Sequence, residues 1–165
     1  MQRPSKIDYY LNIAKEVAQR GTCLRRRFGA VIVKEDQIIS TGYVGAPRGT
    51  KNCSDIGTCP REEANIPSGE RYELCRSVHA EQNAIINAAR AGVSVLGGTM
   101  YIYGENVKDS QVVEGKPCKL CRRYLINAGL KNIVIKSKND YKEFKIEDFV
   151  NEDLFEYKND NYKGY

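Results

Sequence analysis

Two short motifs constrain what this 165-residue chain can fold into, because each sets metal-binding side chains at the head of a helical run. The first run spans residues 77–90, SVHAEQNAIINAAR, and contains the chain's only histidine, His79. The second begins at residues 117–121, PCKLC, where Cys118 and Cys121 stand three positions apart. Thiolate and imidazole both suit Zn²⁺, and three protein ligands leave a fourth tetrahedral position for water, as in catalytic zinc sites. We therefore predict one catalytic zinc held by His79, Cys118 and Cys121.

Glu81 is the remaining chemical group of the first motif. It lies two residues after His79, so we predict that it transfers protons to and from a water beside the metal and is not itself a ligand. A C-x-x-C at a helix start favours thiolates, because its sulfurs lie near free backbone N–H groups and the positive end of the helix dipole. Pro117 suits that position because its missing N–H would be unpaired there. H-x-E followed by P-C-x-x-C is typical of zinc-dependent base deaminases, whereas either half alone also occurs on surface helices, in redox pairs and in zinc ribbons.

Four further cysteines lie outside these motifs, in or near an irregular insertion at about residues 45–76 that is rich in Gly, Pro and charge. A loop of that length inside a compact domain is normally functional or held in place by an additional feature such as a metal ion. Four thiolates around a structural zinc would supply folding energy that an apolar-poor loop lacks. The spacings match no zinc ribbon, however, and free cysteine is also a common core residue, so both interpretations stay open. These residues are Cys23, Cys53, Cys59 and Cys75.

Composition sets the broad class of the protein. With 41% hydrophobic and 28% charged residues, residues 1–165 are expected to form one globular domain. Residues 1–10 lack the apolar core of a signal peptide and no apolar run is long enough for a membrane span, so we expect a cytoplasmic protein with reduced cysteines. The net charge of +5 is too small to indicate duplex binding, although a few arginines suffice to bind a phosphate. The candidates for that phosphate contact are Arg25, Arg26 and Arg27.

Hydrophobic periodicity predicts an amphipathic helix at residues 5–20, with Ser5 and Asp8 at its start and Gly21 as its stop. The other expected elements, in chain order, are strands at 28–34 and 37–44 joined by Glu35-Asp36, a helix at 79–90, a strand at 99–103, a helix at 118–128, a strand at 131–136, a helix around 143–155 and a frayed tail at 158–165. This order predicts a three-layer α/β domain, a mixed central sheet with helices on both faces, and the zinc between the N-termini of the two central helices.

With these residues in place, the chain resembles the cytidine deaminase superfamily over about residues 9–135. Within it, the HAEQNAI and PC-x-x-C…AG blocks and the GAVIV…IISTGY hairpin are similar to those of the deoxycytidylate deaminases. The resemblance implies a cytidine-deaminase-like fold and a hydrolase that converts dCMP to dUMP and ammonia in pyrimidine nucleotide metabolism. It implies the zinc ligands and proton shuttle already predicted, and a structural zinc in the 23–76 region. It also implies a homo-oligomer and regulation by deoxynucleoside triphosphates, whereas the modest net charge argues against a nucleic-acid partner.

Two positions depart from that pattern. Val44 stands where relatives have an asparagine that helps to hold the sugar, which puts sugar recognition in question. Lys116 stands before the Pro-Cys where a small hydroxylic residue is common, and we expect it near a substrate phosphate. The segment 104–116 is also longer than usual, and its role is open.

Three other functions stay open at this point. One is a deaminase acting on another base or on a polynucleotide, such as tRNA or single-stranded DNA, which must admit a flipped base with its neighbours. Another is a non-catalytic zinc-binding module, which would have no use for Glu81. The third is a thiol redox protein that uses Cys118 and Cys121, which a metal assay of reduced protein distinguishes.

Overall fold

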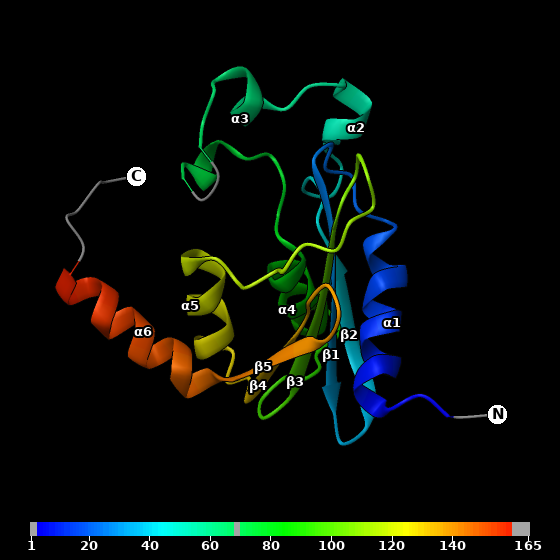
Figure 1. Ribbon diagram of the computed structural model, residues 1–165, viewed down its shortest axis with the longest axis vertical. Coiled ribbons are helices and arrows are strands. Elements are labelled where there is room, and N and C mark those ends of the chain that lie inside the picture. Colours follow the sequence, from blue (N-terminus) through cyan, green and yellow to red (C-terminus); the bar gives the residue numbers. More distant parts are fainter. Residues whose placement is uncertain (1–2, 68–69, 160–165) are drawn as a thin grey trace.

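The fold is built on a five-stranded mixed sheet with strand order β2-β1-β3-β4-β5 (Figure 1). The computed structural model describes residues 3–67 and 70–159. Strands β3 and β4 are parallel, whereas the other neighbouring pairs are antiparallel. The elements are α1 (Lys6–Ala18), β1 (Arg26–Lys34), β2 (Gln37–Tyr43), α2 (Cys53–Ile56), α3 (Pro60–Glu63), the 3-10 helix η1 (Tyr72–Leu74), α4 (Ala80–Arg90), β3 (Thr99–Asn106), α5 (Lys119–Asn127), β4 (Asn132–Lys136), β5 (Tyr141–Lys145) and α6 (Ile146–Asn159).

Helices cover both faces of the sheet, so the predicted three-layer α/β architecture is confirmed. Helix α1 lies on one face, and α4 and α5 lie on the other (Figure 1). Side chains alternate along β1 because successive residues of a strand point to opposite faces. Val31 and Val33 therefore pack with α1, whereas Ala30 and Ile32 pack in the core beneath α4 and α5. The two apolar layers each have a buried core of their own.

Close contact with β2 fixes the position of α4. A Cβ atom on Gly42 would lie 2.2 Å from the backbone nitrogen of Ala84, so only glycine allows the helix to approach this closely. Ser40 Oγ donates a 2.6 Å hydrogen bond to the carbonyl of Ala84, and Asn83 Nδ2 donates one of 2.8 Å to the carbonyl of Tyr43. These contacts hold the first turns of α4 against the sheet.

The N-termini of α4 and α5 point toward the same end of the molecule, beneath the insertion that carries α2, α3 and η1 (Figure 1). The parallel crossover from β3 through α5 to β4 produces this arrangement, because it returns α5 to the face that α4 already covers. The insertion is not one irregular loop, since short helices form at three places in it. The sequence motifs of both central helices are thereby brought to one place.

Most predicted elements are confirmed, with differences at their ends. The Ser5 hydroxyl accepts a 3.0 Å hydrogen bond from the Asp8 backbone, as predicted, but α1 ends at Ala18, before Gly21. The predicted hairpin turn is also present, and both of its residues have positive φ, 51° at Glu35 and 64° at Asp36.

The predicted C-terminal helix was wrong in its first part. Residues 141–145 instead form β5, which pairs antiparallel with β4 at the sheet edge. Helix α6 begins at Ile146 and includes residues 158 and 159, which we expected in the frayed tail; residues 160–165 lie outside the described residues. Within the described part of the chain, no helix is long and apolar enough to cross a membrane.

Candidate metal centre and active-site pocket

Three metal-binding side chains meet between the N-termini of α4 and α5. His79 is the N-cap residue of α4, and Cys118 is the N-cap residue of α5. His79 Nδ1 lies 3.6 Å from the sulfur of Cys118 and 3.3 Å from that of Cys121. All three ligand atoms lie within 4.8 Å of one another. The structure therefore brings together the three residues that we predicted as catalytic zinc ligands.

Hydrogen bonds at the helix N-termini orient His79 and Cys118. The His79 backbone N–H donates to Gln82 Oε1 at 3.2 Å, which caps the helix, while the imidazole contacts the two cysteine sulfurs. The Cys118 sulfur accepts a 3.4 Å hydrogen bond from the backbone N–H of Cys121. Hydrogen bonding to the Cys121 thiol, together with the contact with His79, lowers the pKa of Cys118 to about 4. The same contact between the two sulfurs, with burial, raises the pKa of Cys121.

This donor set fits zinc. One imidazole and two sulfurs are ligands that zinc accepts, and three protein ligands correspond to a catalytic site with one open position. Because the Cys121 thiol keeps its proton when no metal is bound, metal binding must release a proton from this pair. The residues that would hold the ion are His79, Cys118 and Cys121.

Glu81 is buried at the same place, with 8% of its surface exposed. Burial raises the pKa of its carboxyl group, which also lies within hydrogen-bonding reach of the Cys121 thiol. A carboxyl group whose pKa is raised by burial is suited to accept and return a proton near neutral pH. The position predicted for the proton shuttle is therefore next to the three ligands, in the first turn of α4.

A pocket opens onto this group, and its walls come from the insertion as well as from the sheet. Tyr72 of η1 lies edge-on to the His79 ring, with ring centres 5.1 Å apart. Arg61 of α3 lies over the Tyr72 ring at 4.8 Å from its centre. Glu81 and Cys118 line the same pocket. The insertion therefore forms part of the site and does more than connect two elements.

The predicted substrate-binding residues divide into two groups. Those that line the pocket are Arg25, Arg26, Val44 and Lys116. Arg27 does not line the pocket, and its Nη1 donates to Gln19 Oε1 at 3.1 Å and lies 3.6 Å from Glu105 Oε1. Alternation along β1 explains the difference, since Arg27 points to the α1 face and Arg26 to the opposite face.

Two of these pocket residues are already paired with carboxylates. Arg25 Nε lies 3.4 Å from Glu62 Oε1. Lys116 Nζ donates to the carboxylate of Glu152 at 2.9 Å. Lys116 therefore lines the pocket, as a phosphate contact requires, with its ammonium group already paired.

The four cysteines outside the motifs lie near one another without forming a ligand group. Burial raises the pKa of the Cys53 thiol, and the three other sulfurs add to this effect through their charges. Three of the four line the pocket. In the described part of the chain, however, only His79, Cys118 and Cys121 form a group of three or more potential ligands within 4.8 Å. The four residues are Cys23, Cys53, Cys59 and Cys75.

Two pocket residues were missed at the sequence level, Arg61 and Tyr72. Both lie in the insertion, where no periodicity predicted which side chains point inward. The only signal was the low apolar content of this segment, which makes an aromatic side chain such as Tyr72 a candidate for the buried side.

Comparisons with known proteins agree with this site. The sequence model of the cytidine and deoxycytidylate deaminase zinc-binding region matches residues 4–137. A deoxycytidylate deaminase of Mycobacterium phage D29 is 35% identical over 139 residues, which cover 81% of this chain and 96% of the phage protein. One from Schizosaccharomyces pombe is 34% identical over 80% of this chain, but the chain spans only 37% of that relative's length.

Solved structures show the same fold. The dCMP deaminase of cyanophage S-TIM5, in complex with dCMP and dUMP, superposes with a TM-score of 0.59 and 25% identity, covering 81% of this chain and 82% of the phage chain. A cytidine deaminase mutant from Mycobacterium tuberculosis has a TM-score of 0.51 at 16% identity and covers 88% of this chain and 94% of the other. At that identity, the second similarity concerns the fold alone.

Proposed function

Because the chain belongs to the cytidine and deoxycytidylate deaminase family, we propose that it is a hydrolase that deaminates a cytosine nucleotide, dCMP, to dUMP and ammonia. The observation that carries this proposal is the group of His79, Cys118 and Cys121, with Glu81 buried beside it in a pocket that also contains arginines. The ligands bind the metal, the carboxyl group moves protons, and the cations suit an anionic substrate.

The proposed mechanism assigns the proton transfers to Glu81. When bound, zinc supplies Lewis acidity, which lowers the pKa of water toward neutrality. Glu81 takes a proton from the attacking water and delivers it to N3 of cytosine, which makes C4 electrophilic. After the water oxygen has added to C4, Glu81 transfers the hydroxyl proton to the amino group. The C4–N bond then breaks, ammonia leaves, and the proton on N3 remains in the uracil product.

Substrate contacts are proposed for the pocket residues alone. Arg26 lies on the pocket wall formed by the start of β1, where it favours a negatively charged group, and Arg25, although paired with Glu62, adds positive charge beside it. Val44, 6% exposed, supplies an apolar wall and no hydrogen bond from its side chain. We therefore propose that phosphate contributes more to recognition than the sugar does.

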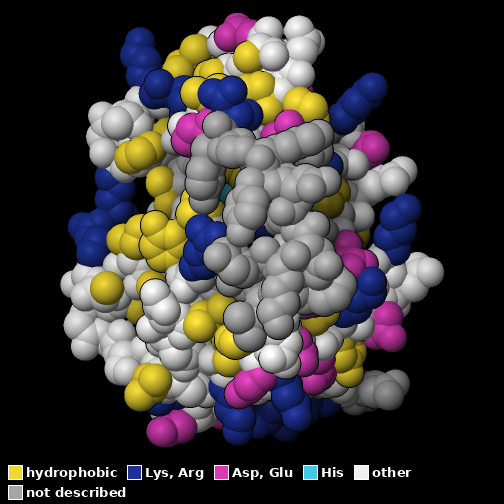
Figure 2. Space-filling view, turned by 90° about the vertical axis from the view of Figure 1, so that its left-hand side faces the viewer, with side chains coloured by type: hydrophobic (Ala, Val, Ile, Leu, Met, Phe, Trp, Pro, Cys, Tyr) yellow, Lys and Arg dark blue, Asp and Glu magenta, His cyan; other side chains and the backbone are white. Residues whose placement is uncertain are grey.

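A deaminase acting on a polynucleotide is the alternative. It needs a basic track that follows the nucleic-acid backbone on either side of the pocket. On the face drawn in Figure 2, Lys and Arg side chains are instead scattered among acidic and uncharged ones, outside the part that grey atoms cover. This distribution favours a mononucleotide substrate.

We further propose that Cys23, Cys53, Cys59 and Cys75 hold a second, structural zinc. Their mutual proximity in and beside the insertion supports the proposal, and an ion would have to draw their sulfurs closer together.

A homo-oligomer, regulation by deoxynucleoside triphosphates and a cytoplasmic location are also proposals, which follow from the family. In the described residues, β2 is an edge strand that pairs only with β1, so its other side is available for contact with a second copy of the chain. Light scattering of the purified protein, with and without each deoxynucleoside triphosphate, tests both the assembly and its response to nucleotides.

An ammonia-release screen of zinc-loaded protein tests the main proposal. Cytosine, adenine and guanine are offered as nucleosides, monophosphates, triphosphates and short single-stranded oligonucleotides. We expect dCMP to give the highest rate. If the protein deaminated only an oligonucleotide or another base, the assignment of dCMP as substrate would be wrong. The zinc-dependent mechanism would still hold.

A further inference from the structure

We infer that Arg61 of α3, together with Arg26 of β1, binds the phosphate monoester of the substrate and sets the preference for a nucleotide over a nucleoside. This inference rests on the proposed function, because it names the residues that recognise the anionic part of the proposed substrate. Arg61 is the new element of this inference, because it lies in the insertion and neither zinc-binding motif predicts a role for it.

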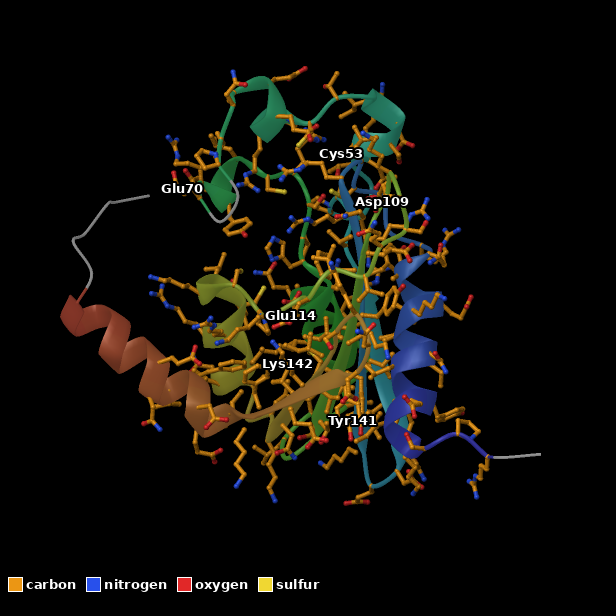
Figure 3. All side chains as sticks on the ribbon, in the orientation of Figure 1. Cys53, Glu70, Asp109, Glu114, Tyr141 and Lys142 are labelled. Carbon is orange, nitrogen blue, oxygen red and sulfur yellow. The ribbon has the colours of Figure 1, made fainter. Side chains whose placement is uncertain are left out.

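The surroundings of Arg61 are unusual for a cation. It is only 6% exposed. Its Nη2 donates to the backbone carbonyls of Pro67 at 2.8 Å and Glu70 at 2.7 Å, the latter beside η1 in Figure 3. Among the described residues, Nε is buried without a hydrogen-bond partner, and no carboxylate lies within ion-pair distance of the guanidinium. A buried charge without a counter-ion is destabilising, so this group is suited to an anion that arrives with the substrate.

Arg61 also lies at the right distance from the reaction centre. Its Cζ is 4.8 Å from the centre of the Tyr72 ring, and that ring centre is 5.1 Å from the centre of the His79 ring. Taken together, the two distances mean that Arg61 Cζ is separated from the His79 ring by no more than about the length of a nucleoside. A base placed beside Glu81 would therefore put its 5′-phosphate near Arg61, which lines the same pocket.

Arg26 approaches from the other wall of the pocket. Within the described part of the chain, its side chain has neither an ion pair nor a hydrogen bond. Burial raises the pKa of Tyr72, whereas the positive charges of Arg61 and Arg26 act to lower it, so both cations lie near this phenol.

The remaining charged residues of the pocket are already occupied. Arg25 pairs with Glu62 and Lys116 with Glu152, as described above. Of the two carboxylates in the lining, Glu114 pairs with Lys142 at 2.7 Å and Glu81 is assigned to proton transfer. Arg26 and Arg61 are therefore the cations left for a dianionic ligand. A charge-assisted hydrogen bond to phosphate is about twice as strong as a neutral one.

The test uses Arg61→Gln and Arg26→Gln, with Arg27→Gln as the matched control from the same basic run on the opposite face of β1. For each zinc-loaded variant, kcat/KM is measured for dCMP and for deoxycytidine, and equilibrium binding is measured by calorimetry for dUMP and for deoxyuridine. We expect each site variant to lose at least about tenfold with dCMP and in dUMP affinity while the nucleoside values stay within about twofold. The control should keep the parent ratio of nucleotide to nucleoside.

A purely structural role for Arg61 would lower the nucleotide and nucleoside values equally, and that result would overturn the inference. An unchanged ratio in both site variants would overturn it as well. The binding measurements separate it from the proposed function. If dUMP binding depended on the two arginines but no substrate were deaminated, the phosphate subsite would be supported and the proposed activity refuted. If dCMP were deaminated and both site variants kept the parent ratio of nucleotide to nucleoside, the activity would be supported and the subsite refuted.

Discussion

Lys116 Nζ donates hydrogen bonds to both carboxylate oxygens of Glu152, at 2.9 and 3.0 Å. Lys116 lies two positions before Cys118, whereas Glu152 belongs to α6, beyond the part of the chain that the family model matches. Glu152 also lies 3.0 Å from Nη1 of Arg122, the residue that follows Cys121. One carboxylate on the C-terminal helix therefore contacts both ends of the segment that carries two metal ligands.

The first prediction follows from this contact. Glu152→Gln should keep the fold but release zinc to a chelator about threefold to tenfold faster, because the ligand segment loses its ion pairs. The effect is modest because Lys116 and Glu152 are 35% and 36% exposed, and solvent screens such pairs. The measurement is zinc release to a colorimetric chelator. Glu147→Gln on the exposed side of the same helix is the control, and equal rates in the two variants would contradict the prediction.

The second prediction separates proton transfer from metal binding. Glu81→Gln should retain zinc and fold while kcat falls by at least about a hundredfold, because an amide cannot carry a proton. His79→Ala should instead lose the metal, since it removes a ligand. Metal content by elemental analysis and dCMP turnover are measured on the same samples. Loss of zinc from the Gln variant, or activity within about tenfold of the parent, would show that Glu81 has a different role.

The third prediction concerns substrate preference in the parent protein. We expect a kcat/KM for dCMP at least about a hundredfold above that for deoxycytidine, which corresponds to about 2.7 kcal/mol of transition-state binding. The reason is the set of cations in the pocket, whereas Val44, which we propose lies beside the sugar, is apolar. CMP is included to compare ribose with deoxyribose, for which we expect a smaller difference. Equal values for the nucleoside and the nucleotide would exclude phosphate recognition.

The metal ligands could be predicted from sequence because their geometry is local. His79 and Cys118 each cap a helix, and the cap position follows from the helix start without knowledge of the tertiary fold. Their meeting needed one further step, the crossover that places α4 and α5 on the same face. The direction of Arg27 follows from the alternation of β1, because Val31 and Val33 of the same strand also point to the α1 face.

Other features depend on contacts that no local pattern contains. Arg61 is held inward by two backbone carbonyls of the insertion, and Tyr72 by its approach to His79. Neither contact leaves a periodic signal in the sequence. Strand β5 was missed for a related reason, since it is an edge strand in which most side chains are exposed and the apolar alternation is weak.

The fourth prediction tests the close packing of α4 against β2. Gly42→Ala should lower the free energy of unfolding by about 3 kcal/mol or more, because its Cβ would meet the helix backbone 2.2 Å away and backbone cannot rotate out of the way. The measurement is urea unfolding of zinc-loaded protein. Thr41→Ala, the neighbouring change that adds no atoms, is the control. A loss below about 1 kcal/mol would mean that α4 shifts freely on β2.

The last prediction concerns the four cysteines outside the motifs. If they hold a structural zinc, elemental analysis of reduced protein should give about two zinc ions per chain, and Cys53→Ser with Cys59→Ser should lower the count to about one. That double variant should also unfold at a lower temperature, because the insertion would lose the ion that stabilises it. His79→Ala gives the complementary control, since it should remove the catalytic zinc alone. A count near one in the parent, unchanged by the two serines, would identify these cysteines as ordinary thiols packed beneath the insertion.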